Sequence, residues 1–586
     1  MRRRLSLLVL FFVLAVPATA HAGTFPGDPI DGPAPNLQVA DLDLARDGTG
    51  AVAYTRPEGV FVSRFVGGRF QPPEGLGPAG GGAAVAAGNN GRLAVVFESG
   101  GMIYAMLKPS GDQPWGSPVL LGAGSDPAAD MSINNTAYAT FTQAGSVLVA
   151  RLDRVTNAWT LLPVPADADP AALAGTGALR SRVAVSADGV GIIVWGERGA
   201  DGRTHVIARK VFGTRLSSSP QDLTLAEGGS ADSPEVDAEW DSSFAWVTFR
   251  QTIGGVSRTV ARRQRGTAFD DPVFTDGGNA AVAPRIAISG RGEGLLSATG
   301  GAHGLGAVLR NDQVGQAFGI GPGAGTLTAP AMAENSDGMI AFAQPTGVAI
   351  RPFDAGKPLA EVALTRGELG PVDLEGGLDA EVDRANSGVV VWTQGSAAAR
   401  SLVAGYVDRP PLAFSVTSNS KWRNPQRLPL RWASAFELWG PVTYTVQIGG
   451  RVVGQTQGTM LRPKTPLPEG RRTMRVIATD IRGQSRRSRS RTVRIDMTAP
   501  QLTVRVERDG GVSRIRWRAR DVSRPRGSSG FSHVRIQFGD GSRSRVVSSG
   551  RGSVSHRYRR SAKLRVVAVD RAGNETVVER DVRRRS

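Results

Sequence analysis

The chain has 586 residues, no cysteine, and a formal net charge of +18 at neutral pH. The lack of cysteine excludes disulfides, thiolate metal sites and a lipid anchor on an N-terminal cysteine. Its 75 glycines and 36 prolines are typical of many short strands joined by tight turns, and a chain of this length contains several domains.

The first segment is predicted to be an export signal. Residues 2–4 are arginines, residues 5–16 are apolar, and Ala20-His21-Ala22 matches the small-x-small pattern that precedes a cleavage site. An apolar run of about twelve residues is too short to span the ~30 Å hydrocarbon core of a membrane. We therefore predict a signal peptide at residues 1–22, no transmembrane span, and a secreted or cell-surface protein.

One short sequence motif, which we call the recurring phrase, is repeated eight times between residues 39 and 407. It consists of a strand of small apolar residues, a tight polar turn, and an apolar strand that mostly ends on an aromatic residue. The clearest copy, residues 182–195, turns at Asp188-Gly189, a dipeptide that favours hairpins. A period near ~45 residues built only of strands is typical of a propeller blade. The copies end on Tyr54, Phe97, Phe141, Trp195, Phe249, Ala298, Phe342 and Trp392.

This repeat predicts an all-β fold that begins with a β-propeller over residues 23–409. Eight blades are expected, with seven as the alternative because the sixth copy, which ends at Ala298, is degenerate. The last copy lacks a fourth strand, whereas residues 24–32 belong to no copy. We therefore expect residues 24–32 to close the ring as the outer strand of the last blade, because closure removes free sheet edges.

A second repeat begins after Pro410-Pro411. Its period of about 90 residues is close to the size of an immunoglobulin-like sandwich. Two tandem β-sandwich modules are therefore predicted, over residues 410–497 and 498–586. The echoed segments are residues 430–432 with 515–517, 444–451 with 534–541, and 475–483 with 565–573.

The second module also resembles a known family. It carries Phe538-Gly-Asp-Gly-Ser542, then His556-Arg-Tyr558, then Val567-Ala-Val-Asp570 followed by Gly573-Asn574. These elements in this order resemble the PKD domain of many bacterial surface and secreted proteins, and the resemblance implies a spacer or adhesion module without catalysis. The first module has Ile448-Gly-Gly-Arg451 in place of the turn, so we expect it to be Ig-like or fibronectin-III-like.

Charge divides the chain at the same boundary. Residues 411–586 contain 38 Lys and Arg against 12 Asp and Glu, a net charge of +26, whereas the residues before them carry −8. Strand alternation over residues 512–520 is expected to direct four arginines outward and the apolar residues inward. The candidate anion-binding residues are Arg486, Arg487, Arg489, Arg491, Arg514, Arg516, Arg518 and Arg520.

These arginines have two interpretations. They form a solvated face that keeps the modules soluble, or they bind an anionic cell-surface polymer or polysaccharide. Aromatic residues that could stack on bases are sparse among them, so nucleic acid is the least favoured partner. A protein partner on a face of the propeller is a further alternative.

The sequence gives little support for catalysis. The histidines after the signal segment are isolated from one another, and neither a Gly-x-Ser-x-Gly elbow nor a phosphate-binding loop is present. No catalytic residue, metal ligand or cofactor is therefore predicted. A recurring Gln or Glu two residues after the aromatic position is expected to hydrogen-bond backbone between blades, with a ligand-reading rim as the alternative. These residues are Gln143, Glu197, Gln251, Gln344 and Gln394.

We expect an exported, non-catalytic binding or adhesion protein. In this interpretation the propeller supplies the recognition face, and the basic modules attach to an anionic cell-envelope or extracellular polymer. The alternative is a secreted polysaccharide-acting hydrolase with a glycosidase-like propeller. That alternative requires carboxyl groups with separated pKa values in the propeller mouth.

Overall fold

The structure is a computed structural model that describes residues 22–583, except residues 79, 168–172, 218, 240–241, 275–280, 311–312, 324, 510 and 522–526. The predicted signal peptide, apart from Ala22, therefore lies outside the described residues. The described residues form strands, turns and short 3-10 segments, without an α-helix among them. Accordingly, no described helix has the length and apolar character needed to cross a membrane.

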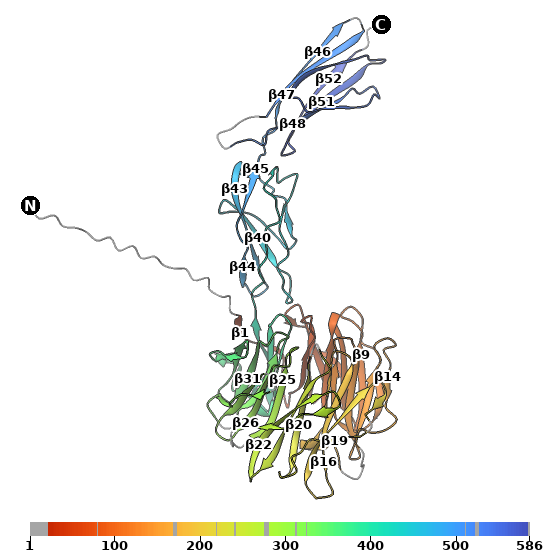
Figure 1. Ribbon diagram of the computed structural model, residues 1–586, viewed down its shortest axis with the longest axis vertical. Coiled ribbons are helices and arrows are strands. Elements are labelled where there is room, and N and C mark those ends of the chain that lie inside the picture. The colour runs from red at the N-terminus through yellow and green to blue at the C-terminus, as the bar shows by residue number, and fades with distance from the viewer. Residues whose placement is uncertain are drawn as a thin grey trace, which may run out of the picture. The chain divides into compact units, whose positions relative to one another are not determined.

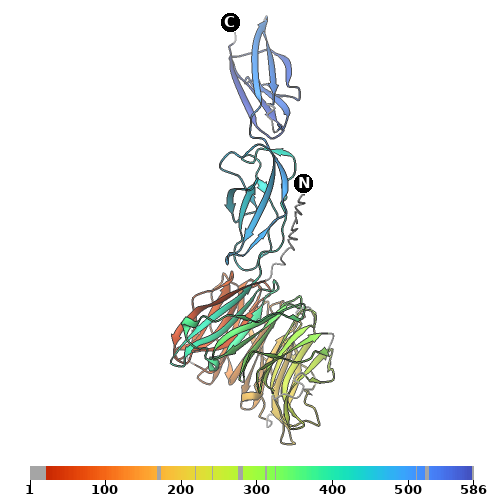
Figure 2. The same cartoon turned by 90° about the vertical axis from the view of Figure 1, so that its left-hand side faces the viewer.

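The chain divides into two compact units, Met1–Arg409 and Pro410–Ser586, which are drawn in Figures 1 and 2. Unit 1 contains eight successive antiparallel sheets of four or five strands, which we number 1 to 8 in chain order. The innermost strands of these sheets are β2 (Gln38–Leu44), β7 (Ala83–Gly88), β11 (Ser125–Met131), β15 (Arg182–Val185), β20 (Ala231–Ala238), β25 (Ala281–Ile288), β30 (Leu327–Met332) and β35 (Leu378–Val382).

Each innermost strand pairs with a second strand, and each second strand pairs with a third. The second strands are β3 (Gly50–Arg56), β8 (Arg92–Ser99), β12 (Ala137–Gln143), β16 (Val190–Arg198), β21 (Ala245–Ile253), β26 (Gly294–Gly300), β31 (Gly338–Gln344) and β36 (Gly388–Ser396). The third strands are β4 (Gly59–Val66), β9 (Met102–Lys108), β13 (Ser146–Leu152), β17 (Thr204–Phe212), β22 (Val256–Arg265), β27 (Gly304–Arg310), β32 (Gly347–Asp354) and β37 (Ala399–Asp408).

Outer strands complete the sheets, and all of them are short except the twelve-residue β1. They are β1 (Gly23–Ala34), β5 (Arg69–Phe70), β6 (Glu74–Gly77), β10 (Val119–Ala123), β14 (Trp159–Leu161), β18 (Arg215–Leu216), β19 (Gln221–Asp222), β23 (Ala268–Phe269), β24 (Val273–Phe274), β28 (Gln313–Val314), β29 (Phe318–Ile320), β33 (Lys357–Pro358) and β34 (Val362–Ala363). The recurring phrase of the sequence is thus the hairpin of innermost and second strands, and all eight residues that end its copies are buried between neighbouring sheets.

The ring is closed by the N-terminal strand. β1 pairs antiparallel with β37, from Gly23 opposite Asp408 to Ala34 opposite Arg400, so the last sheet contains both ends of unit 1. The innermost strand β35 of sheet 8 packs beside β2 of sheet 1. In Figure 2 the red first strand lies beside the blue-green strands of the last sheet. The prediction that residues 24–32 supply the missing outer strand is therefore confirmed, and unit 1 is a β-propeller.

Unit 2 contains two groups of sheets, each with its own apolar core. In the first, the core surrounds Trp432 and Tyr444, and in the second it surrounds Trp517 and Ile536. The first group comprises β38 (Trp422–Arg423), β39 (Leu430–Arg431), β40 (Thr443–Ile448), β41 (Arg451–Thr456), β42 (Met460–Leu461), β43 (Gly470–Thr479), β44 (Ser485–Arg487) and β45 (Arg491–Ile495).

The second group is a sandwich of two sheets that share one core. One sheet has the order β46-β47-β50, and the other has the order β49-β48-β51-β52. The strands are β46 (Gln501–Asp509), β47 (Val512–Arg520), β48 (Phe531–Gln537), β49 (Arg545–Val547), β50 (Arg551–His556), β51 (Ala562–Asp570) and β52 (Glu575–Val582).

Trp392 is expected to support the closure of the ring. Its side chain is fully buried, and a Cβ placed on Gly27 of β1 would lie 2.6 Å from its ring, so the closing strand fits closely over it. We expect Trp392→Ala to lower the free energy of unfolding of unit 1 by about 3–5 kcal/mol, because it leaves a cavity beneath β1. Phe212→Ala, at a position that is 64% exposed, is the control. Calorimetry of the full chain measures both, and equal effects of the two substitutions would contradict this role.

Candidate functional site

The propeller encloses a cavity of about 490 Å³ on its axis, which we call the channel. All eight innermost strands line it. Among the described residues, its walls carry twice as many carboxylates as arginines. The carboxylates are Asp41, Asp43, Asp126, Asp130, Glu235, Asp237, Asp379 and Glu381, and the arginines are Arg46, Arg180, Arg182 and Arg285.

Most of the channel carboxylates that lie inside the ring also join neighbouring sheets. An innermost strand pairs with its own sheet along one edge, so the N–H groups of its other edge need acceptors. An aspartate from the preceding sheet accepts from such an N–H at four of the sheet–sheet junctions. The N···O distances are 3.1 Å from Leu42 to Asp379, 2.8 Å from Val85 to Asp41, 2.6 Å from Ala87 to Asp43, 2.5 Å from Val185 to Asp130, and 2.6 Å from Ile288 to Asp237.

The charged side chains form two layers along the channel. Residues two apart on a strand face the same side and lie about 7 Å apart, so Asp41 and Asp43 occupy different layers of one wall. The same spacing separates Glu235 from Asp237 and Asp379 from Glu381. The first member of each pair lies in one layer, together with Arg182 and Arg285. We call it the mixed layer: Asp41, Arg182, Glu235, Arg285 and Asp379. The second member lies in the other layer, together with Asp130, and we call it the acidic layer: Asp43, Asp130, Asp237 and Glu381.

In the mixed layer four of the five charged groups form two ion pairs, and burial, followed by the charge of Asp379, raises the pKa of the fifth group, Asp41, to about 8. The Arg182 Nε lies 3.0 Å from an oxygen of Glu235, and the Arg285 Nη1 lies 3.2 Å from an oxygen of Asp379. Burial raises the pKa of Asp379, and the charge of Arg285 opposes that rise. The charge of Asp379 in turn raises the pKa of Arg285. This layer therefore comes close to internal charge balance.

In the acidic layer the strongest electrostatic influences are other carboxylates. Burial raises the pKa of Glu381 well above its usual range, and the charges of Asp43, Asp379, Asp237 and Asp41 raise it further. Burial likewise raises the pKa of Asp43, and the charge of Asp130 is the next cause. Burial raises the pKa of Asp237 to about 7. The acidic layer therefore favours protonation or a bound cation over four free negative charges.

The recurring Gln and Glu positions do not line the channel. Gln251 donates to the carbonyl oxygens of Leu225 and Gly229, at 2.9 and 3.1 Å, in the segment that connects sheet 4 to sheet 5. Gln394 donates to Arg366 and Gly370 in the segment before sheet 8, at 2.7 and 2.6 Å. Gln251 and Gln394 therefore hold the backbone between neighbouring sheets, as the favoured interpretation of the sequence predicted. Gln344 instead donates to the Thr326 hydroxyl, and Glu197 accepts from the Trp195 indole.

The predicted arginines fall in two places in unit 2. Arg514, Arg516, Arg518 and Arg520 are exposed on β47, and Ile515, Trp517 and Ala519 between them are buried, so the predicted alternation is confirmed. Arg486 and Arg487 lie on β44, Arg489 lies between β44 and β45, and Arg491 begins β45, all in the other group of sheets. Arg491 donates through Nη1 to the carbonyl oxygen of Val416 at 2.9 Å, which gives it a structural contact.

The histidines are engaged in local contacts. In His205, Nδ1 lies 2.8 Å from Asp222 and Nε2 lies 3.1 Å from Asp201, so both ring nitrogens have carboxylate partners. In His556, Nε2 lies 2.7 Å from Asp540, and the ring stacks on Phe538 with centroids 3.9 Å apart. These contacts fix loops and strands and leave neither ring poised beside a reacting group.

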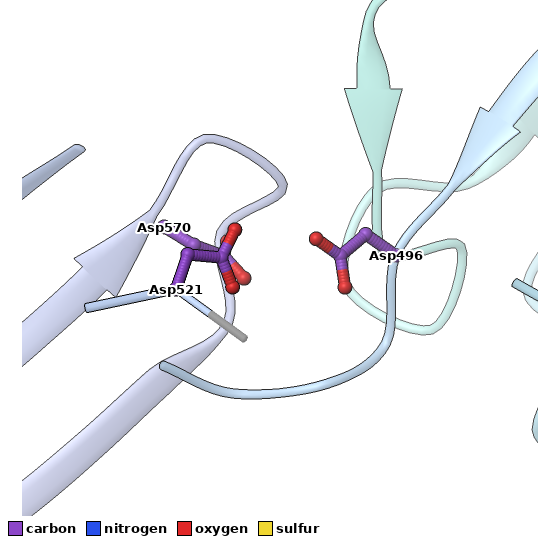
Figure 3. A group of neighbouring side chains, drawn as sticks. All are labelled: Asp496, Asp521 and Asp570. Atoms are coloured by element: carbon purple, nitrogen blue, oxygen red, sulfur yellow. The ribbon is translucent and has the colours of Figure 1, made fainter. Parts of the chain in front are cut away.

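Unit 2 contains one compact group of carboxylates. Oxygens of Asp496, Asp521 and Asp570 lie within 4.8 Å of one another, and Figure 3 shows the three side chains facing the same space. Three carboxylates at this spacing are of the kind that hard cations prefer. Each of them, however, already accepts backbone N–H groups: Asp496 from Ser529 at 2.7 Å, Asp521 from Gly530 at 2.6 Å, and Asp570 from Asn574 at 2.8 Å. We therefore assign the group a structural role.

The channel carboxylates were missed by sequence reasoning. A single chain does not reveal which of its many acidic residues converge on the axis of a ring. The available signal was an acid-x-acid pattern inside strands of small apolar residues, in Asp41-x-Asp43, Glu235-x-Asp237 and Asp379-x-Glu381. Because side chains alternate between the two faces of a strand, the two acids of each pair must lie on the same face. Their strands are the first of each repeat, which lie nearest the axis of the propeller.

Comparisons with known proteins identify no family. No family model matches the chain, and no curated protein matches its sequence. Similar solved structures include the Dos1 propeller, which is 9% identical, has a TM-score of 0.42 and covers 66% of this chain and 96% of its own. AofleA from Arthrobotrys oligospora is 8% identical with a TM-score of 0.31, over 51% of this chain and 91% of its own. The α-L-arabinofuranosidase PaAbf62A from Podospora anserina is 12% identical with a TM-score of 0.24, over 44% of this chain and 99% of its own. At these values the similarities carry no argument about function.

The stability of unit 1 is expected to fall as pH rises. Because folding raises the pKa of Asp237 from 3.8 to about 7, the folded protein binds this proton more tightly than the unfolded chain does. Its contribution to stability is complete below about pH 4 and is lost as pH rises through about 7. We expect Asp237→Asn, which mimics the neutral acid, to flatten the dependence of the melting temperature on pH across this window.

The matched control is Asp112→Asn, which removes a carboxylate that is exposed. It should leave the pH dependence of the wild-type chain unchanged. Melting curves of the full chain between about pH 4 and pH 8 measure the effect. If the melting temperatures of Asp237→Asn and the wild type changed with pH in the same way, Asp237 would not titrate in the channel.

Proposed function

We propose that the protein is an exported, non-catalytic binding protein. Its β-propeller carries the recognition site, and its basic C-terminal modules attach it to an anionic polymer or polysaccharide of the cell surface. The support for attachment is an arginine-covered sheet face in the second group of unit 2, which we call the arginine face. It consists of Arg505 on β46, Arg551 on β50, and Arg514, Arg516, Arg518 and Arg520 on β47.

Cross-strand pairing makes the arginine face unfavourable on its own. Arg505 lies directly opposite Arg516, and Arg518 lies directly opposite Arg551. Like charges directly opposite in a sheet are destabilising. Two exposed carboxylates of β46 lie on this face, Glu507 and Asp509. Glu507 lies directly opposite Arg514 and 3.2 Å from Arg516, and because the Glu507 and Arg516 side chains are half exposed, that pair contributes little. A polyanion along the strands would relieve this repulsion, which a merely solvated face would leave in place.

The opposite sheet of the same sandwich is better balanced. Lys563 lies 2.6 Å from Glu579, and Arg565 lies 3.9 Å from the same carboxylate. The two faces of one small module therefore differ in how far their cations are neutralised. If the arginines served solubility alone, there would be no reason for the cations of one face to be less neutralised than those of the other. Attachment to a polyanion through the arginine face provides such a reason.

A second candidate function is hydrolysis of a polysaccharide. Carboxyl groups with raised pKa values in the channel favour it, because glycosidases use a protonated carboxylic acid beside an ionised one. Against it, Asp43, Asp130 and Asp237 each accept a backbone N–H of the neighbouring sheet, which accounts for their positions. Release of reducing ends from polysaccharides by the wild-type chain, and its loss in Asp237→Asn, would favour this candidate over binding alone.

The test of attachment uses the full chain and a defined polyanion. We expect the wild-type chain to sediment with isolated cell envelopes and to bind dextran sulfate at ~0.05 M salt, and to be released at ~0.5 M salt, where the Debye length is below about 5 Å. Replacing Arg514, Arg516, Arg518 and Arg520 together by Gln should weaken both interactions at least about tenfold, because four of the six cations of the arginine face are removed.

The matched control removes the same charge from unit 1. Arg69, Arg154, Arg198 and Arg215 are exposed, and their joint replacement by Gln changes the net charge equally. It should leave sedimentation and dextran sulfate binding unchanged. A specific role of the arginine face would be contradicted if both variants lost binding equally. It would also be contradicted if binding did not depend on salt, or if the wild type bound neutral dextran as well as dextran sulfate.

A further inference from the structure

We propose that the channel of the propeller binds a small aliphatic diamine or polyamine, held through its protonated amines by Glu381 together with Asp43, Asp130 and Asp237. This inference rests on the proposed function in taking the propeller as the recognition unit. It is independent of the arginine face, which lies in unit 2.

Glu381 is the residue that the architecture leaves unexplained. It follows Asp379 by two positions on β35, as Asp43 follows Asp41 on β2. Asp379, Asp41 and Asp43 each accept an N–H from the next sheet. No hydrogen bond from any described residue reaches the Glu381 carboxylate, and the charges that act most strongly on it are those of four carboxylates. An ionised acid enclosed among acids and without a structural partner is costly, so Glu381 is either protonated or joined by a cation.

The arginines of the channel do not supply that cation. Arg182 is committed to Glu235 and Arg285 to Asp379, both in the mixed layer. Arg46 is paired with Glu334, on the segment that follows β30. The carboxylates that act on Arg180, the fourth channel arginine, are Glu235 and Asp126, which lie outside the acidic layer. Wherever its carboxyl groups are ionised, the acidic layer therefore carries negative charge that the described arginines do not neutralise, in a space large enough for a small ligand.

The spacing of the carboxylates favours an extended organic cation over a single metal ion. Among the described residues, the group of three acidic side chains whose oxygens approach within 4.8 Å is the one in unit 2. The acidic layer instead draws on sheets 1, 3, 5 and 8. Asp43 and Asp237 belong to sheets 1 and 5, which lie across the ring from each other. A ligand with two separated amines can reach both walls, whereas one ion cannot.

Small or branched apolar residues also line the channel between the carboxylates. Ala128 lies on the same strand as Asp130, and the others lie on strands that carry none of the four carboxylates: Val85, Ala87, Val185, Ala287 and Pro330. Such surfaces suit methylene groups and offer few partners to hydroxyls. Charged ends with an alkyl chain between them match this pattern of acidic and apolar wall, and a polyhydroxylated amine does not.

The experiment titrates the full chain with 1,4-diaminobutane and spermidine by calorimetry, at ~0.15 M salt to screen non-specific attraction to the surface. Butylamine, glucosamine and calcium chloride are the comparison ligands. We expect saturable binding of the diamine and of spermidine, and at least about tenfold weaker binding of butylamine and glucosamine, a difference of about 1.4 kcal/mol.

Glu381→Gln is the decisive variant, because it keeps the size of the side chain and breaks no recorded hydrogen bond. It should weaken diamine binding at least about tenfold, a loss of about 1.4 kcal/mol, without lowering the melting temperature. Glu227→Gln, which removes an exposed carboxylate of unit 1, should bind as the wild type does. If calcium displaced the diamine at a concentration stoichiometric with the protein, the result would overturn this proposal in favour of a metal site.

Failure of this inference is distinguishable from failure of the proposed function. No saturable binding of either amine, or equal binding by Glu381→Gln and the wild type, would overturn the diamine site. The variant with four arginines of β47 replaced should still bind the diamine. Conversely, Glu381→Gln should still sediment with cell envelopes, because its arginine face is intact.

Discussion

The unpaired edge of each innermost strand is the constraint on which the propeller and its channel both depend. A strand at the axis hydrogen-bonds its own sheet along one side, and the N–H groups on its other side must find acceptors away from bulk water. Aspartates of the preceding sheet meet this need for Leu42, Val85, Ala87, Val185 and Ile288. The carboxylates are thus drawn to the axis by the backbone itself, and the acidity of the channel follows from how the sheets are joined.

The same type of interaction recurs in unit 2. Asp496 and Asp570 are buried carboxylates that accept backbone N–H groups, and Asn574 links them by donating to the carbonyl oxygen of Asp496 and to the side chain of Asp570. Asn424 of the first group of sheets donates to Asn574 of the second at 2.6 Å. This chain without cysteine therefore uses buried polar side chains to fix segments that are distant in sequence.

The fold was more predictable than the site, for a physical reason. Hairpins such as β15–β16 are local, so the turn at Asp188-Gly189 and the buried Trp195 reveal them within fourteen residues. The outward arginines of β47 follow from strand periodicity in the same way. The acidic layer depends instead on four strands brought together by closure of the whole ring, and no local pattern encodes that meeting. Asp496, Asp521 and Asp570 likewise converge only after two groups of sheets have formed.

The connection between the two units leaves the propeller at the strand best placed to carry a load. The chain passes from β37 at Asp408 to Arg409, and Arg409 is held by Asp337 at 2.6 Å and by Ser387. β37 is hydrogen-bonded along both sides, by β36 and by the N-terminal strand β1. Tension applied through unit 2 acts along β37, across two ladders whose hydrogen bonds lie perpendicular to the strands and so resist shear together. The strand that closes the ring thereby also holds the second edge of β37, the strand from which the chain leaves unit 1.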